Sequence, residues 1–434
     1  MTAIDRFIRV RLWRYLMDDP VRRRSSALIA SQAISATTAF AFWLLCAHLY
    51  DPKTVGLAIS TVSLSSLVAS FTGLGLPTAV LRYAPSVSRP AGFIGTALGL
   101  VTVASLLGGL SALLVVAHWV HSLSSVLQSW VPSMVFVGLV LGLTLSGVTD
   151  AILLSSGYSG SVLVKTVLIS VPRLSLPLLG LAFGVLGIVI SYGLTFIVGI
   201  TFAMLLVIHR FGLRSIAEGQ IAQIRAHHKF IASNYIGGLF GVLPVTFIPI
   251  LVLNGLGAKA AAFSYIPLQI GGFLAVIPSS VSQSLLTVAS SAETREQEVL
   301  LFRQALRHSI RLVLVAIPAL TLVGTLTLRL YGIQYYHNGL LILLCVAASG
   351  YFVVINWLGD TWLNIRMRAE LYLLMNILNA GAVVLGVLIM MRFGIVGVGL
   401  GWLIGQALSG LIYLTAFTRQ GLVGWDAASR KKRV

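Results

Sequence analysis

The sequence predicts an all-α membrane protein whose helices cross the bilayer about twelve times. Of its 434 residues, 57% are hydrophobic and only 10% are charged, and the mean hydropathy is +0.96. A soluble domain carries about 25% charged residues, so this chain has too few polar side chains to cover a water-exposed surface. One helical crossing needs about 20 apolar residues, so a chain of this length can make twelve crossings with short connections.

Twelve apolar stretches have the length of such crossings. They lie at residues 26–49, 54–76, 92–117, 131–154, 161–182, 186–208, 230–253, 261–289, 309–332, 338–364, 370–391 and 395–417. Several contain proline, which membrane helices tolerate where neighbouring groups satisfy the freed backbone. The first stretch is too long for the hydrophobic region of a signal peptide and leads directly into the second, so we expect no cleavable signal.

The lysines and arginines indicate the orientation of the chain. If the N-terminus is cytoplasmic, 23 of the 30 lie in the N-terminal arm, the cytoplasmic loops or the C-terminal tail, and four lie in the outer loops. An excess of positive charge in short cytoplasmic loops is typical of membrane proteins. We therefore expect a multi-pass protein of the cytoplasmic (inner) membrane with both termini in the cytoplasm. The same distribution favours membrane lipids as partners, and we expect no nucleic acid partner.

The chain divides into two halves of six predicted spans each. The expected segments are a basic amphipathic cytoplasmic arm at 1–24, an N-terminal lobe at 25–209, a cytoplasmic linker at 210–229, a C-terminal lobe at 230–418 and a basic cytoplasmic tail at 419–434. A Phe-Gly-x-x-Gly sequence begins at Phe183 and again at Phe393, and the same offset of 210 residues relates Asp150 to Asp360. Because six is an even number, we expect the two lobes to run in parallel through the membrane.

Two runs near the N-terminus resemble the sequences of a known family, and so do the two Phe-Gly-x-x-Gly sequences, which we call the glycine corners. Residues Leu49–Gly56 and Thr72–Tyr83, with an apolar span between them, resemble the first two helices of the polysaccharide transporter family of O-antigen and exopolysaccharide flippases. The corners at Phe183 and Phe393 are similar to that family too. The family belongs to the MOP (multidrug/oligosaccharidyl-lipid/polysaccharide) superfamily, together with MATE transporters. The resemblance implies a bundle of two lobes around a central cavity, alternating access, and a lipid-linked glycan as cargo.

Motifs of several other function classes are absent from the sequence. There is no G-x-x-x-x-G-K-[ST] loop for ATP, no H-E-x-x-H and no paired Cys/His set, so we expect no cofactor and no metal. Cys46 and Cys345 lie in apolar stretches and support neither a disulfide framework nor a zinc site. Short outer loops with few acids argue against a glycan polymerase or ligase, which stays the enzyme alternative. We expect a transporter without an ATPase motif.

Charged residues inside the predicted spans are the first candidates for functional sites, because an unpaired charge in hydrocarbon is costly. Arg173 lies near the middle of the fifth span, where its planar guanidinium could bind a phosphate or pyrophosphate. The alternatives for Arg173 are a buried ion pair and a polar contact between helices. A helical hairpin would bring Lys165 beside Asp150, which predicts an ion pair between them. Alternatively, Asp150 and Asp360 bind a coupling cation or proton, and Lys165 contacts substrate.

The remaining candidates are two arginines near helix ends and the amides of the second half. Arg82 and Arg311 lie near cytoplasmic ends, where long side chains reach water or contact substrate. Amides are concentrated in the C-terminal lobe, and Asn356 and Asn376 are the cavity candidates among them. Amides in a cavity suit sugar hydroxyls, although hydrogen bonds between helices explain such residues equally well.

The leading hypothesis is a flippase that moves a polyprenyl-(pyro)phosphate-linked oligosaccharide across the cytoplasmic membrane for surface polysaccharide biosynthesis. Its partners would be the glycan polymerase and the glycosyltransferases of the same pathway. In this hypothesis the cationic first half binds the phosphate and the amide-rich second half meets the glycan. A MATE-like, cation-coupled multidrug or small-solute antiporter is the alternative.

Overall fold

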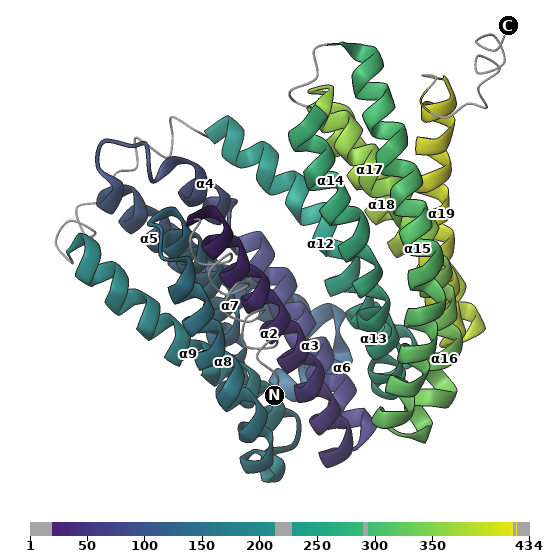
Figure 1. Ribbon diagram of the computed structural model, residues 1–434. Coiled ribbons are helices and arrows are strands. Elements are labelled where there is room, and N and C mark those ends of the chain that lie inside the picture. Colours follow the sequence, from purple (N-terminus) through teal and green to yellow (C-terminus); the bar gives the residue numbers. More distant parts are fainter. Residues whose placement is uncertain (1–19, 213–227, 290–293, 420–421, 423–434) are drawn as a thin grey trace, which may run out of the picture. The chain divides into compact units, whose positions relative to one another are not determined.

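The computed structural model describes residues 20–212, 228–289, 294–419 and 422, and in these ranges every regular element is a helix (Figure 1). Eleven of the described helices are long and apolar enough to cross a membrane, and a bent pair of helices would make a twelfth span. The predicted all-α polytopic class is therefore confirmed. Most of the predicted amphipathic arm, most of the linker and most of the basic tail lie outside the described residues, and the last five residues of the arm, 20–24, belong to the first described helix.

The chain forms two compact units, Met1–Tyr235 (unit 1) and Ile236–Val434 (unit 2). The described helices that lie wholly within unit 1 are α2 (Pro20–Leu49), α3 (Pro52–Thr72), α4 (Leu76–Tyr83), α5 (Pro90–Trp119), α6 (His121–Leu127), α7 (Trp130–Ser155), α8 (Ser159–Leu179) and α9 (Gly184–Phe211), with the 3₁₀ turn η1 (Leu181–Phe183) before α9. Helix α2 packs along α8, and α7 packs between α5 and α9. The core of unit 1 joins α4, α5 and α7 through side chains such as Val80, Phe93 and Ile152.

Helix α12 (His228–Leu256) begins in unit 1 and continues into unit 2. The other elements of unit 2 are α13 (Ala258–Gly272), η2 (Phe273–Ala275), α14 (Val276–Ala289), α15 (Arg295–Tyr331), α16 (Ile333–Ala348), α17 (Gly350–Ile365), α18 (Ala369–Met390), η3 (Met391–Phe393) and α19 (Val396–Arg419). Helix α18 packs along α19, and α14 packs against α15 and α17. Phe302, Leu358 and Phe417 are fully or almost fully buried at the core of this unit.

The helices differ from the predicted spans in several places, among them the predicted span 261–289, which consists of α13, η2 and α14. The predicted span 338–364 is divided at Ser349 into α16 and α17, whose axes differ by 42°. The span predicted at 54–76 ends at Thr72, and after a turn in which Gly75 has φ +67° the separate helix α4 begins. Helix α15 starts at Arg295, well before the predicted residue 309, because Thr294 caps it by accepting a hydrogen bond from the Gln297 amide.

The two glycine corners have the same backbone structure. In each, a 3₁₀ turn ends at a glycine of positive φ, Gly184 (φ 52°, ψ −124°) or Gly394 (φ 74°, ψ −154°), a region that side chains rarely adopt. Three residues later, a Cβ on Gly187 would overlap the carbonyl oxygen of Gly180, and one on Gly397 would overlap that of Met390. This backbone structure therefore requires both glycines of each motif. The offset of 210 residues relates the glycines of the first motif to those of the second.

Many large apolar side chains on the outer faces of the helices are exposed. On α5, Leu107 is 64% and Leu114 is 68% exposed, and on α15, Val315 is 71% and Leu322 is 66% exposed. Such faces would be unfavourable in water and suit the hydrocarbon of a bilayer. The polar side chains inside each unit therefore stand out against an apolar background.

Candidate functional site

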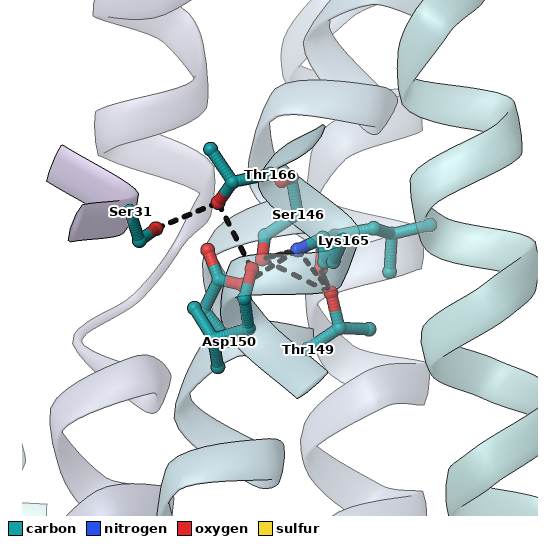
Figure 2. A network of polar contacts seen from close by, with 8 residues as sticks. Ser31, Ser146, Thr149, Asp150, Lys165 and Thr166 are labelled. Atoms are coloured by element: carbon teal, nitrogen blue, oxygen red, sulfur yellow. Dashed lines mark hydrogen bonds and ion pairs between the residues drawn. The ribbon is translucent and has the colours of Figure 1, made fainter. Parts of the chain in front are cut away.

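Lys165 forms an ion pair with Asp150 inside unit 1, as the hairpin of α7 and α8 predicts. Its Nζ lies 2.9 Å from Oδ1 of Asp150, 2.9 Å from Oγ1 of Thr149 and 2.6 Å from the carbonyl oxygen of Ser146 (Figure 2). An ammonium has three N–H donors, and each has an acceptor here. The Lys165 side chain is 1% exposed, whereas that of Asp150 is 40% exposed. This arrangement favours the ion pair over substrate contact by Lys165.

The same hairpin is connected to α2, the first of the described helices. Thr166, next to Lys165, shares a 2.7 Å hydrogen bond with Ser31 of α2, so α2, α7 and α8 meet around one polar network (Figure 2). Polar contacts between helices substitute for water in the membrane interior. The network explains why polar residues recur along α8 despite its apolar surroundings.

Arg173 lies on α8 about two helical turns after Lys165, and its surroundings are aromatic. Its Cζ is 4.1 Å from the ring centre of Tyr192 and 5.0 Å from that of Phe196, both on α9. One terminal nitrogen donates to the Tyr192 carbonyl at 3.4 Å and to Thr195 Oγ1 at 3.3 Å. The residue is 6% exposed and its Nε has no hydrogen-bond partner.

Within the described part of the chain, no carboxylate forms an ion pair with Arg173. The faces of aromatic rings attract a guanidinium and offset part of its desolvation. They do not supply the acceptors that its remaining N–H groups require. Of the two alternatives for Arg173, the buried ion pair is not observed among the described residues, whereas the polar contact with another helix, α9, is observed. The guanidinium still retains unused donors.

Unit 2 contains a cavity of about 530 Å³, which we call the unit-2 cavity. Residues from seven helices (α12, α13, α14, α16, α17, α18 and α19) line it. Its volume falls in the usual range of small-molecule sites, about 300–1,000 Å³. The wall contains Asp360, the amides Asn356, Asn376, Asn379 and Gln406, and the aromatic residues Trp357, Tyr372 and Trp402. The structure thus brings three of the sequence-predicted residues, Asp360, Asn356 and Asn376, to one cavity.

Asp360 is held in the cavity wall by two donors from neighbouring helices. The Tyr413 hydroxyl of α19 donates to its Oδ1 at 2.5 Å, and Asn376 Nδ2 of α18 donates to the same oxygen at 3.3 Å. Asn376 Nδ2 also donates to the Tyr372 carbonyl at 2.9 Å. No lysine or arginine of the described ranges forms an ion pair with Asp360. Its carboxylate is oriented by neutral groups and lacks a fixed counter-ion.

The amides of the cavity are partly satisfied by one another. Asn356 Nδ2 donates to Gln406 Oε1 at 2.8 Å, and Ser409 Oγ donates to Asn379 Oδ1 at 2.8 Å. Asn356 is 5% exposed, and its Oδ1 has no hydrogen-bond partner. Ser282, also in the wall, has an unpartnered and buried Oγ. The amides therefore serve as contacts between helices and still present unused polar groups.

Positions related by the offset of 210 residues have different surroundings in the two units. Asp150 on α7 and Asp360 on α17 are separated by this offset, and in each unit the next helix supplies a donor to the carboxylate. In unit 1 the donor is the cation of Lys165, whereas in unit 2 the position 210 residues after Lys165 is Met375 and the donor is the neutral Asn376. The first carboxylate is neutralised within the protein and the second is not.

The two arginines predicted near helix ends lie away from these clusters. Arg82 on α4 and Arg311 on α15 are both exposed. Neither is part of the unit-2 cavity wall or of the Lys165 network. Their possible contact with substrate stays a prediction.

Tyr413, Trp402 and Tyr372 were not identified from the sequence. Trp402 donates from Nε1 to Ser349 Oγ at 3.2 Å, which fixes its ring beside the break between α16 and α17. A pattern could have indicated Tyr413, because Gln406, Ser409 and Tyr413 have the spacing of one helix face. The same face of the first half lacks this pattern, with Ala203 at the position 210 residues before Tyr413.

The structure is similar to solved transporters over most of its length. An inward-facing multidrug resistance MATE family transporter of the MOP superfamily matches with a TM-score of 0.65 and 15% identity, over 94% of this chain and 99% of that chain. A MATE in complex with MaD5 matches with a TM-score of 0.61 and 15% identity, over 93% and 97%. An outward-facing MATE family transporter matches with a TM-score of 0.58 and 15% identity, over 93% and 96%.

No protein-family model matches the sequence, and the comparison with curated proteins finds no match. The similarity is therefore one of fold: this chain has the fold of MATE transporters of the MOP superfamily.

Proposed function

We propose that this protein translocates a polyprenyl-(pyro)phosphate-linked oligosaccharide from the inner to the outer leaflet of the cytoplasmic membrane by alternating access. The unit-2 cavity is the observation that carries this proposal. The proposed orientation has both termini in the cytoplasm, and the product would serve surface polysaccharide assembly by a glycan polymerase. The glycosyltransferases that build the oligosaccharide would act before this step.

The chemistry of the cavity wall supports a sugar ligand. Each sugar hydroxyl both donates and accepts hydrogen bonds, and a side-chain amide does the same through its NH₂ and its oxygen. Asn356 and Asn376 keep a side-chain oxygen, and Asn379 an NH₂ group, that bond to no described residue. The wall also contains Trp357 and Trp402, whose rings can pack against the apolar face of a sugar. A few polar groups on a largely apolar wall fix the orientation of a ligand.

Arg173 supports an anionic group elsewhere on the substrate. A guanidinium forms paired, charge-assisted hydrogen bonds with phosphate oxygens. The unpartnered Nε of Arg173 and the absence of a carboxylate partner among the described residues leave this capacity unused. We assign the phosphate-binding role to Arg173 and the glycan-binding role to unit 2. We propose that an ion gradient or the substrate gradient supplies the energy for transport.

A cation-coupled antiporter of small solutes is the second candidate. Asp360 favours it, because a carboxylate without a fixed counter-ion in a cavity can bind a proton, a metal cation or a cationic solute. The fold is shared with multidrug resistance MATE family transporters. In the flippase proposal, Asp360 instead contributes to coupling or to sugar contact, and Asp150 stays neutralised by Lys165.

Deleting the gene separates the two candidates. The flippase proposal predicts that lipid-linked oligosaccharide accumulates on the cytoplasmic leaflet and that surface polysaccharide is lost. Normal surface polysaccharide together with increased sensitivity to cationic dyes would favour the antiporter and contradict the flippase. Complementation with Asn356→Ala/Asn376→Ala should fail, whereas Asn338→Ala should restore polysaccharide. Among the described residues, the Asn338 side chain bonds to Gln334 on its own helix, α16, and it is not part of the cavity wall.

A further inference from the structure

The unit-2 cavity has an unusual balance of charge for a protein with net charge +18. Among the described residues that line it, Asp360 is the one acid, and there is no lysine, arginine or histidine. The intramembrane cations Lys165 and Arg173 belong to α8 in unit 1. The wall of this cavity therefore offers a bound group many neutral partners, one negative partner and no positive partner.

We propose that the unit-2 cavity selects sugar residues that carry no acidic group, and that Asp360 is the residue that determines this selectivity. The accepted sugars are neutral sugars and amino sugars, and the rejected ones are uronic acids and other acidic sugars. The inference rests on the proposed function, which it deepens by naming the class of glycan.

Three groups in the cavity wall have unused hydrogen-bonding capacity that suits neutral hydroxyls. Oδ2 of Asp360 accepts no hydrogen bond from the described residues, because both of its donors, Tyr413 and Asn376, bond to Oδ1. The side-chain oxygens of Gln406 and Asn379 each accept a hydrogen bond, and their NH₂ groups donate none to the described residues. Two donors and one charged acceptor match the mixed donors and acceptors of a sugar ring.

A uronate would be unfavourable in the same position. Its carboxylate would lose water without gaining a cation, which is the most costly way to bury a charge. The uronate carboxylate would also approach the carboxylate of Asp360, and the two negative charges would repel each other. Asp360 could not easily move away, because Tyr413 and Asn376 bond to it. An amino sugar would bind favourably instead, since its ammonium can form a charge-assisted hydrogen bond with Oδ2 of Asp360.

Binding of three defined trisaccharides to the purified full-length protein in detergent tests the proposal. The probes are maltotriose, the trimer of glucosamine and the trimer of galacturonic acid, and the readout is tryptophan fluorescence, to which Trp357 and Trp402 of the wall contribute. We expect the galacturonate trimer to bind at least about tenfold more weakly than maltotriose, the equivalent of about 1.4 kcal/mol. The glucosamine trimer should bind at least as tightly as maltotriose.

Two cavity variants and one control connect the result to Asp360. Asp360→Asn should reduce the discrimination against galacturonate to less than about threefold, equivalent to about 0.7 kcal/mol. Gln269→Lys adds a cation at an exposed position of the wall, leaves the Asp360 contacts intact, and should also admit galacturonate. Glu298→Gln changes an acid that pairs with Arg366 outside the cavity and should keep the wild-type discrimination.

Each outcome decides the proposal. Equal binding of maltotriose and galacturonate trimers by the wild type, or no binding of any trimer, would overturn it. Discrimination that survives unchanged in both Asp360→Asn and Gln269→Lys would overturn it as well. The proposed function fails separately: a protein that discriminates among the trimers but does not translocate any lipid-linked oligosaccharide in vesicles keeps the selectivity and loses the flippase role.

Discussion

The Nζ of Lys165 lies 2.9 Å from Oδ1 of Asp150, whereas Asp360, at the position 210 residues after Asp150, bonds to the neutral groups of Tyr413 and Asn376. One repeat of the chain thus contains a carboxylate with its own counter-ion, and the other contains a carboxylate in a cavity without one. From this difference we propose a structural role for the first and a role in binding a ligand or a cation for the second.

The two partners of the Lys165–Asp150 pair should not be equally replaceable. Asp150→Asn leaves an ammonium that is 1% exposed without its counter-ion, and should cost about 3 kcal/mol. Lys165→Met leaves a carboxylate that is 40% exposed, and should cost only about 1 kcal/mol, because this group can reach polar surroundings. Thermal unfolding of the purified variants in one detergent checks the order.

The double variant Asp150→Asn/Lys165→Met is the matched control for this pair. It removes both charges and should be more stable than Asp150→Asn alone, because no uncompensated charge remains buried. An Asp150→Asn protein as stable as the wild type would show that the ion pair does not hold α7 against α8.

The glycine corners predict a sharp contrast between positions. Gly187→Ala and Gly397→Ala place a Cβ onto a backbone carbonyl, which can move only if the corner opens. Each should cost about 3 kcal/mol or fail to fold, at the upper end of what overpacking costs. Gly147→Ala on α7 and Gly381→Ala on α18 meet no atom within 4 Å and should be neutral or slightly stabilising.

The folded yield after membrane extraction, measured by fluorescence-detected size-exclusion chromatography, compares the four variants. Equal yields from the corner variants and their controls would contradict the close approach at both corners.

Arg173 should tolerate lysine better than an apolar residue if it binds a phosphate. Lysine keeps the charge but cannot bind two phosphate oxygens at once as the planar guanidinium does, and it loses part of the stacking on Tyr192. Transport should therefore fall about tenfold. Arg173→Met keeps the length and the apolar packing and should abolish transport without lowering stability. Comparing the transport rates and the melting temperatures of both variants separates binding from structure. Full transport by Arg173→Met would refute the phosphate role.

Leu422 follows the end of α19 and packs into the hydrophobic core of unit 2. It is fully buried, its carbonyl accepts a 3.0 Å hydrogen bond from Arg303 Nε, and its amide donates to the Phe417 carbonyl at 2.9 Å. Leu422→Ala should destabilise unit 2 by about 2–4 kcal/mol. Leu411→Ala, at a position that is 50% exposed, should change stability by less than about 0.5 kcal/mol in the same thermal measurement. A small effect at Leu422 would contradict its burial.

The sequence was sufficient for the fold class because membrane helices are specified by local composition. Apolar length predicts a span without knowledge of its neighbours, and the hairpin of α7 and α8 follows from a short connection, so the Lys165–Asp150 pair could also be predicted. The unit-2 cavity could not, since it depends on seven helices and on the break at Ser349. Nothing in the sequence distinguishes Gln406 and Asn356 from the other amides. Only the packing of α17 against α19 places Asn356 Nδ2 2.8 Å from Gln406 Oε1.

Translocation in vesicles tests the central claim most directly. The protein is reconstituted with a polyprenyl-pyrophosphate-linked oligosaccharide, and the fraction of glycan accessible to an external glycosidase is followed over time. The account predicts that the wild type and Asn338→Ala exchange the glycan between leaflets, and that Asn356→Ala/Asn376→Ala is slower by about tenfold or more, through the loss of cavity hydrogen bonds. Glycan exchange no faster than in protein-free vesicles, or unimpaired exchange by the double variant, would contradict it.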